Sequence, residues 1–214
     1  MKKMIVLSDR TPLSTGDFRH CYLHPEDPEK CIKVLKRRKD TRHHGRIERF
    51  FRRGAVDSNR REYDHYLHLA AASVPLERYF PRMYGPMDTD LGQGLCFDLV
   101  RGSEGDAPVS LLKIMKGEGP VDLEADAVLR EVTEFACFCQ RYAILASCDE
   151  PGNIGFVRDG EGYRLVAYDL KFRLNKEFIP ISTLFSSVRR RKVQRRFERL
   201  FEPLAESLGR AGNA

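Results

Sequence analysis

Short apolar runs alternate with turn-forming residues through the first hundred positions of the chain. The runs Met4–Leu7, Phe18–Leu23 and Cys31–Leu35 have the length of β-strands. Two later runs, Pro81–Met87 and Gly94–Val100, repeat the pattern. Polar and proline-containing turns separate neighbouring runs, as expected where a strand reverses direction. The first half of the chain is therefore predicted to form a small antiparallel sheet.

Apolar side chains recur at helical spacing in two stretches. The first follows a cap at Asp57 or Ser58 and contains Glu62 in its first turns. The second, Leu123–Tyr142, is longer and amphipathic. Most of the chain after position 170 is also expected to be helical. Helices therefore dominate the second half.

Two short strands interrupt this helical half. The runs Ile154–Val157 and Tyr163–Tyr168 flank a glycine-rich hairpin sequence. Strands first and helices later indicate an α+β protein with two lobes. We expect residues 1–101 to form a small antiparallel β N-lobe and residues 102–214 to form a reduced, mainly helical C-lobe.

Length and composition agree with a folded protein that has a core. The chain has 214 residues, of which 42% are hydrophobic. No apolar run approaches the roughly 20 residues of a membrane helix, and the start has too few apolar residues for a secretion signal. We therefore expect a cytoplasmic location. The six cysteines lack zinc-site spacing and are expected to be buried free thiols, with Cys137 and Cys139 on different sides of a helix.

Positive charge is concentrated in two segments. Eleven lysines and arginines against three carboxylates lie between Lys36 and Arg61, mostly in an expected insertion at 36–57. Seven lysines and arginines and one carboxylate lie between Arg189 and Arg199. Such segments attract the phosphates of nucleic acid, lipid or a phosphorylated partner, so a phosphate-rich partner and peripheral membrane contact stay open. A solvated helix face is the alternative, and the absence of a nucleic-acid motif argues against a DNA-binding regulator.

Lys33 is the first candidate for a functional-site residue. It lies inside an apolar strand-like run, where an unpaired ammonium would be costly to bury. Glu62 in the following helix is the expected partner. The structural alternative is a lysine at the sheet edge with its amine in solvent.

Asn153 and Asp169 are candidate metal ligands. They are sixteen residues apart and lie at the edges of two strand-like runs. Amide and carboxylate oxygens suit Mg²⁺ that is held jointly with phosphate oxygens. Asp169 can alternatively be an ordinary turn residue at the end of a strand.

The order of these elements resembles the protein kinase superfold. The residues that carry this resemblance are a glycine turn, Cys31–Val34, Arg61–Glu62, Pro151–Ile154 and Tyr168–Asp169. The opening segments Leu7–Gly16 and Arg19–Asp27 resemble the YrbL family of PhoP regulatory network proteins. The resemblance covers most of the chain and implies a kinase-like protein or a regulator of the PhoP network, with ATP and Mg²⁺ as cofactors.

The resemblance also implies a role for each site residue. Lys33, paired with Glu62, would position the α- and β-phosphates. Gly16 marks the nucleotide-covering loop, which has fewer glycines than an ordinary kinase. Asp98 and Val100 would lie in the linker that reads adenine. The magnesium ligands would be the asparagine and aspartate described above.

The expected catalytic loop departs from the kinase pattern. Five positions before Asn153, where a kinase has the aspartate that orients the substrate hydroxyl, the chain has Cys148, and Asp149 follows it. Two functions remain open. One is a weak phosphotransferase that acts on a hydroxyl of a protein or small molecule, and the other is a pseudokinase that serves as a nucleotide-responsive binding module.

Overall fold

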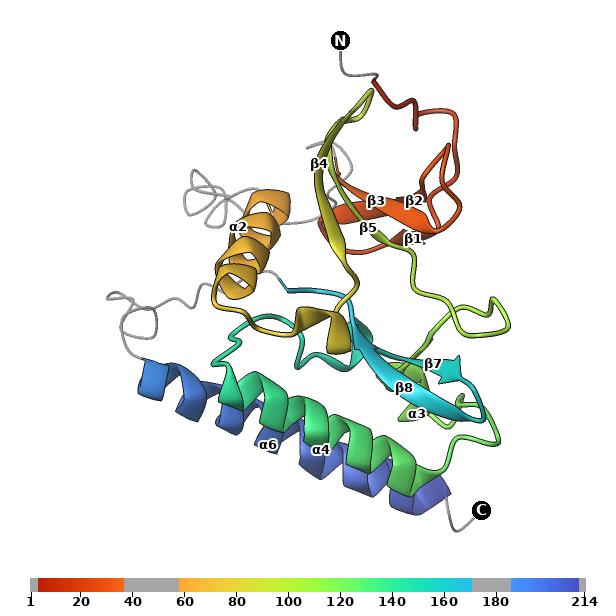
Figure 1. Cartoon of the computed structure of the whole chain (residues 1–214). Helices are drawn as coiled ribbons and strands as arrows, with labels where there is room; N and C mark the ends of the chain where they lie inside the picture. Colours follow the sequence, from red (N-terminus) through yellow and green to blue (C-terminus); the bar gives the residue numbers. More distant parts are fainter. Residues whose placement is uncertain (1–3, 37–57, 171–185, 212–214) are drawn as a thin grey trace, which may run out of the picture. The chain divides into compact units, whose positions relative to one another are not determined.

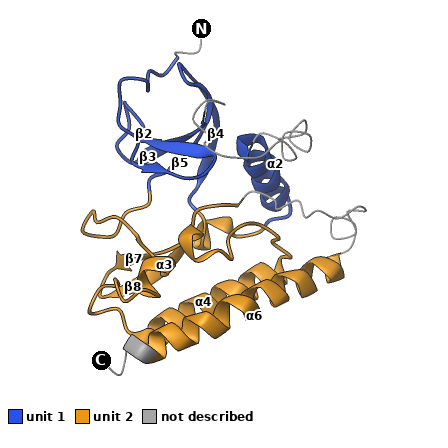
Figure 2. Ribbon diagram, turned by 180° about the vertical axis from the view of Figure 1, so that it is seen from behind, with its two compact units in different colours: residues 1–73, 81–99 blue, residues 74–80, 100–214 orange. Residues whose placement is uncertain are grey.

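The computed structural model describes residues 4–36, 58–170 and 186–211. The expected basic insertion therefore lies, apart from Lys36, outside the described residues. The chain divides into two compact units, shown in Figure 2. The first comprises residues 1–73 and 81–99, and the second comprises residues 74–80 and 100–214. The predicted lobe boundary between residues 101 and 102 stays a prediction, and each unit is described by itself.

The first unit contains a five-stranded sheet in the order β1-β2-β3-β5-β4 (Figure 1). All neighbouring strands are antiparallel. The strands are β1 Ser14–Thr15, β2 Arg19–Leu23, β3 Lys30–Leu35, β4 Met83–Thr89 and β5 Gly92–Asp98. Except at the N-terminus, the predicted strands of this half are confirmed.

The register places Lys33 in the middle of this sheet. Cys21 of β2 lies opposite Lys33, and Leu95 of β5 lies opposite it on the other side. The helix α2, Ser58–Ala71, packs against β3 and β5. Its buried residues include Asn59 and Glu62, which are three positions apart and therefore lie on one face of the helix.

The prediction of a strand at Met4–Leu7 is wrong. Only Ile5 forms an isolated bridge, with Thr89. The backbone N–H of Leu7 donates instead to a carboxylate oxygen of Asp90 at 2.7 Å. A side chain thus provides the hydrogen bond that a neighbouring strand would have supplied, while Leu7 is still fully buried.

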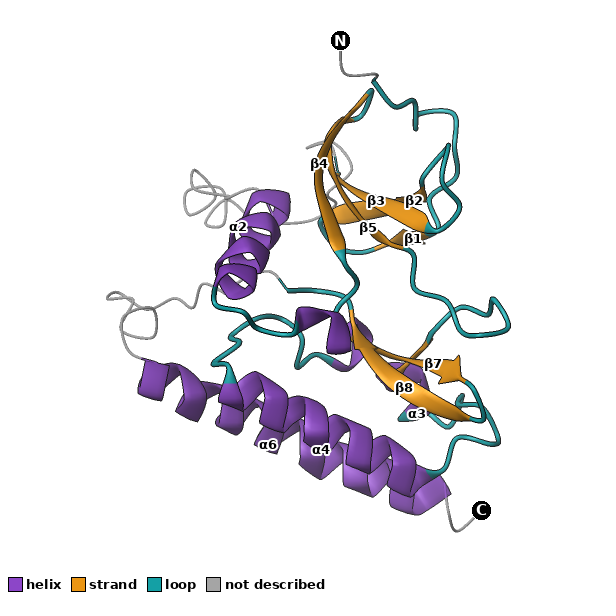
Figure 3. Ribbon diagram, viewed as in Figure 1, coloured by secondary structure: helices purple, strands orange, loops and turns teal. Residues whose placement is uncertain are grey.

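The second unit combines a small sheet with three α-helices among its described residues (Figure 3). Its antiparallel strands have the order β6-β7-β8. The elements are β6 Val109–Ser110, α3 Leu111–Ile114, α4 Ala125–Arg141, β7 Ile154–Asp159, β8 Gly162–Ala167 and α6 Ser186–Ala211. The short 3₁₀ helices η2 Leu76–Arg78 and η3 Pro151–Asn153 complete it. The predicted amphipathic helix and β-hairpin are confirmed.

Helices α4 and α6 lie side by side and enclose an aromatic core. Phe135 of α4 is fully buried, and its ring centroid lies 5.0 Å from that of Tyr79 and 5.7 Å from that of Phe197. This core fixes α6 against the rest of the second unit. Strands in the first unit and mainly helices in the second confirm the α+β class. No helix in the described part of the chain is long and apolar enough to cross a lipid bilayer.

Candidate functional site

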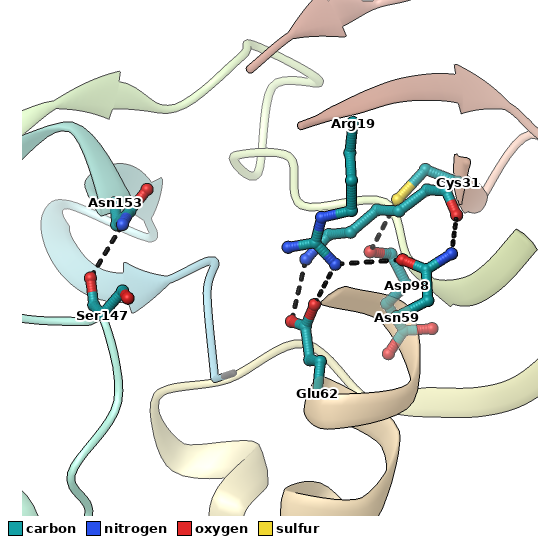
Figure 4. Close-up of polar contacts among 8 residues, drawn as sticks. Arg19, Cys31, Asn59, Glu62, Asp98, Ser147 and Asn153 are labelled. Atoms are coloured by element: carbon teal, nitrogen blue, oxygen red, sulfur yellow. Dashed lines mark hydrogen bonds and ion pairs between the residues drawn. The ribbon is translucent and has the colours of Figure 1, made fainter. Parts of the chain in front are cut away.

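Glu62 is the centre of a charge cluster in the first unit. Its side chain is 1% exposed, and its two oxygens accept from different cations (Figure 4). Lys33 Nζ donates to Oε1 at 3.1 Å, and Arg19 Nη1 donates to Oε2. The contact predicted between Lys33 and Glu62 is therefore present, which excludes the solvated sheet-edge alternative.

Asn59 joins this cluster from the preceding turn of α2. Its amide Nδ2 donates to the backbone oxygen of Lys33 at 2.9 Å, and its Oδ1 accepts from Arg19 Nη1 at 3.2 Å. Lys33 Nζ also lies 4.2 Å from the ring centroid of Phe97. Helix and sheet are thus connected by side chains that fix the position of the lysine amine.

The sequence interpretation missed Arg19 and Asn59. Asn59 could have been found from its spacing to Glu62, whereas Arg19 follows from the register of β2 against β3. Asn59 lies three residues before Glu62 in a helix, and Arg19 lies two residues from Cys21, the position opposite Lys33. One face of the helix and one face of the sheet therefore gather all four polar side chains.

The two cations determine the ionisation of Glu62. Burial alone would raise the pKa of this carboxyl group, but the charges of Arg19 and Lys33, with their hydrogen bonds, lower it to about 2. Glu62 is therefore ionised across the physiological range. Two cations thus contact this one carboxylate.

A thiol with a lowered pKa lies beside this cluster. A hydrogen bond from Cys31 lowers the pKa of the Cys21 thiol to about 7, against the opposing effect of burial, and the charges of Lys33 and Arg19 contribute. All six cysteines are free. The expectation that they are buried is wrong for Cys21, which is partly exposed, and for Cys137, which is exposed. Cys137 and the buried Cys139 do face different sides of α4, as predicted.

The other residues that were predicted to contact the nucleotide are Gly16, Asp98 and Val100. Gly16 belongs to a short turn between β1 and β2, where its N–H donates to the Arg19 oxygen at 3.0 Å. Asp98 ends β5, and its carboxylate accepts from Tyr84 Oη at 2.8 Å. Val100 is partly buried and belongs to the second unit. Their roles in nucleotide binding stay predictions.

In the second unit, Asn153 ends a compact loop that precedes β7. Its Nδ2 donates to the Ser147 oxygen at 2.7 Å (Figure 4). The same nitrogen lies 3.4 Å from a carboxylate oxygen of Glu150. These contacts fix the amide so that nitrogen is the hydrogen-bonded end. Its Oδ1 has no hydrogen-bond partner among the described residues and is suited to a cation.

Asp169 lies near Asn153 because β7 and β8 are paired. Ile154 is opposite Ala167, and the Tyr168 N–H donates to the Asn153 oxygen at 2.9 Å. The next residue is Asp169, which is 6% exposed. The two predicted metal ligands therefore lie at adjoining strand ends. Within the described ranges, no three His, Cys, Asp or Glu side chains converge as a metal cluster, so a magnesium ion here would need oxygens from its ligand as well.

Cys148 is buried in the core. It is 1% exposed, and its sulfur lies 3.9 Å from that of Cys139 in the core. The adjacent Asp149 has a side chain that is 13% exposed and lines a cavity. Of the two residues predicted for the catalytic position, only Asp149 is placed where it can meet a ligand.

Arg196 of α6 connects this loop to the helix. Its Nη1 donates to the Ala146 oxygen at 3.0 Å and lies 3.6 Å from Asp149 Oδ1. Oδ1 is buried and has no hydrogen-bond partner among the described residues. The sequence interpretation treated Arg196 only as part of a basic segment. No sequence signal indicated that a residue 47 positions away would hold Asp149.

Relatives and solved structures resemble this chain to different degrees. YrbL of Escherichia coli (strain K12) and YrbL of Shigella flexneri are each 34% identical over 108 residues, which is 50% of this chain and 45% of theirs. The chain thus aligns with about half the length of these relatives. Two structures of the Mycobacterium tuberculosis PknI kinase domain align over 78% and 76% of this chain and 60% and 58% of theirs. Their identities are 18% and 16%, with TM-scores of 0.47 and 0.44.

The family comparison covers nearly the whole chain. The model described as PhoP regulatory network protein YrbL matches residues 5–205. This range includes the charge cluster around Glu62, both strand-end residues and the loop that contains Asp149. The chain belongs to the YrbL family of PhoP regulatory network proteins.

Proposed function

We propose that this chain is a kinase-like protein that binds a magnesium–adenine nucleotide. The observation that carries the proposal is the buried carboxylate of Glu62, which holds Lys33 Nζ at 3.1 Å. Kinases use such a pair, with the lysine on the third strand and the glutamate on the following helix, to hold the α- and β-phosphates. Here the lysine is on β3 and the glutamate on α2.

The composition of the cluster supports an anionic ligand. Arg19 and Lys33 are 12% and 13% exposed, and both contact the carboxylate of Glu62. Phosphate oxygens accept charge-assisted hydrogen bonds from arginine and lysine side chains. A triphosphate has such oxygens.

The second unit has oxygen atoms suited to the metal. Asn153 Oδ1 and the carboxylate of Asp169 would hold magnesium, which neutralises phosphate charge when bound. The chain's own part is to fix these two groups at the adjoining ends of β7 and β8. Hard oxygen ligands in this number fit Mg²⁺ that keeps water and phosphate oxygens as its other ligands.

Thermal melting with and without Mg-ATP tests the binding proposal. A ligand that binds only the folded state stabilises it by about 2.7 kcal/mol at a hundredfold excess over Kd. We expect melting of the wild type to rise and the shift to be lost in Lys33→Ala and Asp169→Asn. In Lys33→Ala the buried carboxylate of Glu62 keeps a cationic partner, because Arg19 continues to pair with it.

Lys30→Ala is the matched control. It removes a lysine from the same strand, and the lysine pairs with Asp27 at the surface. Its nucleotide-dependent shift should equal that of the wild type. No shift in the wild type at millimolar Mg-ATP would refute the proposal, and equal shifts in Lys33→Ala would refute the residue assignment.

For catalysis we propose very slow or absent phosphotransfer. A positioned general base contributes about 10²- to 10⁴-fold, and Cys148, at the expected position, is buried in the core. Asp149 is the remaining candidate, but Arg196 engages it. The alternative functions thus remain a weak phosphotransferase that uses Asp149 and a pseudokinase.

Turnover of labelled ATP separates these two functions. If Asp149 acts as the base, Asp149→Asn should lower turnover at least about tenfold while Mg-ATP still raises melting. In a pseudokinase the same variant changes nothing. Wild-type turnover in the range of about 1 to 100 per second, typical of kinases, would contradict our proposal.

A further inference from the structure

The second unit contains a cavity beside Asp149 that the nucleotide proposal does not use. Its volume is about 590 Å³, within the range of small-molecule sites. Residues of the catalytic loop and of α6 form most of it, with one residue that follows α3. The lining residues are Met115, Asp149, Glu150, Pro151, Lys192, Arg195, Arg196, Arg199, Leu200 and Pro203.

Positive charge dominates this cavity. Four of its lining residues are cationic and two are carboxylates. Counted from Lys192, the other cationic residues follow three, four and seven positions later, so all four share one face of α6. Arg196 is engaged by the loop through its contacts with Ala146 and Asp149.

The remaining two arginines have different surroundings. Arg195 and Arg199 are exposed and have no ion-pair or hydrogen-bond partner within the described residues. Asp149 Oδ1 is a buried acceptor with no hydrogen-bond donor in the same part of the chain. The cavity thus has two guanidinium groups for an anion and, beside them, the partly exposed carboxylate of Asp149, which can accept from a hydroxyl.

We propose that this cavity binds a phosphorylated small molecule that carries a free hydroxyl. A guanidinium group matches the geometry of a phosphate and binds it through two parallel hydrogen bonds. Asp149 would accept from the hydroxyl, while Met115 and Leu200 would contact the less polar body of the ligand. A sugar phosphate has this combination of groups and a suitable size.

This site is separate from the proposed nucleotide site. None of its lining residues is Lys33, Asn153 or Asp169. Binding can therefore be measured without nucleotide or magnesium, and it can fail while nucleotide binding succeeds. If phosphotransfer occurs, the position of Asp149 makes the bound hydroxyl the natural acceptor.

Titration calorimetry with glucose 6-phosphate, at low salt and without nucleotide, tests the proposal. We expect saturable binding at one site, competition by inorganic phosphate and no binding of glucose. The double variant Arg195→Gln with Arg199→Gln should weaken binding at least about tenfold, because charge-assisted phosphate contacts are lost. Both side chains are exposed, so the fold should be unaffected.

The control double variant is Arg190→Gln with Arg191→Gln. It removes the same charge from the same helix at positions that do not line the cavity. Its affinity should match the wild type. An equal loss in both double variants would show a general charge effect, and that result would overturn the proposal.

Asp149→Asn tests the hydroxyl contact. We expect weaker binding of glucose 6-phosphate and unchanged inhibition by inorganic phosphate, which lacks the sugar hydroxyls. Nucleic acid and anionic lipid also contain phosphate groups, so their binding is measured as well. Retention of single-stranded DNA or of phosphatidylglycerol vesicles that depends on Arg195 and Arg199, without measurable sugar phosphate binding, would overturn the proposal in favour of a polymer or membrane surface.

Discussion

Two carboxylates, one in each unit, illustrate two ways in which this chain holds an acidic group. Glu62 is 1% exposed and has two cationic partners, with Lys33 Nζ at 3.1 Å. Asp149 is 13% exposed and has one described partner, Arg196, at 3.6 Å. The first carboxylate is fully engaged, whereas the second has a buried oxygen without a hydrogen bond in the described structure.

This difference indicates different tasks. A carboxylate that accepts from two cations can fix a lysine but has little capacity left for another ligand. A carboxylate that is partly exposed and has a single described ion-pair partner can still accept from a substrate hydroxyl. The first unit therefore contains a rigid positioning group, and the second contains a group with remaining capacity.

The largest expected effect is that of Glu62→Gln. The substitution removes a carboxylate that pairs with both Arg19 and Lys33, which are 12% and 13% exposed. Breaking a buried pair in this way costs about 3 to 5 kcal/mol. Urea unfolding of the variant should show this loss in the free energy of unfolding. Glu161→Gln, an exposed change in the β7–β8 hairpin, is the control and should lose less than about 0.5 kcal/mol. A small loss in Glu62→Gln would show that the cluster is not structural.

Acid titration sharpens the same comparison. The Arg19 and Lys33 charges lower the pKa of Glu62 from 4.5 to about 2, against the opposing effect of burial. The unfolded state therefore binds the proton first as pH falls. The stability from this carboxylate is fully present above pH 4.5 and is lost as pH falls through about 2, a total of about 3 kcal/mol. We expect Glu62→Gln to abolish this part of the pH dependence. An unchanged curve would contradict the assignment of the low pKa.

Much of the cluster around Glu62 could be predicted because it depends on local sequence patterns. An apolar run around Lys33 requires a counter-charge, and the helical position of Glu62 provides one. The pairing of β7 with β8 likewise follows from a hairpin sequence, and it brings Asn153 near Asp169. Strand length, helix period and turn composition are all visible in the sequence.

The surroundings of Asp149 could not be predicted in the same way. The contact between Asp149 and Arg196 depends on how α6 packs on the rest of its unit, through the aromatic core at Phe135 and Phe197. No local pattern encodes such packing. Cys148 shows the same limit, because counting positions from Asn153 placed it in a catalytic slot while the fold buries it against Cys139.

A third prediction concerns this buried thiol. In Cys148→Asp a carboxyl group would replace a sulfur that contacts Cys139 in the core. We expect a loss of unfolding free energy about 2 kcal/mol greater than in Cys148→Ser, because an unpaired carboxyl is costlier to bury than a hydroxyl. The measurement is urea unfolding of both variants at pH 7. Equal stability of Cys148→Asp and the wild type would show that the loop turns residue 148 outward, and the variant should then be assayed for increased ATP turnover.

The smallest expected effect is that of Asp149→Asn. Arg196 keeps its 3.0 Å bond to the Ala146 oxygen, so the variant does not leave the guanidinium without a contact. The lost ion pair, at 3.6 Å, is long for a strong charge-assisted bond. We expect a loss of about 1 kcal/mol or less in the free energy of unfolding.

A double-mutant cycle of Asp149→Asn with Arg196→Gln measures the pair itself. We expect a coupling energy below about 1 kcal/mol, because Arg196 also holds the loop through the backbone of Ala146. The cycle of Glu62→Gln with Lys33→Met should give a larger coupling energy, since the 3.1 Å contact is buried on both sides. If the two couplings were equal, both carboxylates would be structural, and Asp149 would have no spare capacity for a ligand hydroxyl. A weaker coupling at Asp149, together with the loss of sugar phosphate binding in Asp149→Asn, would instead identify a carboxylate held in place for a ligand.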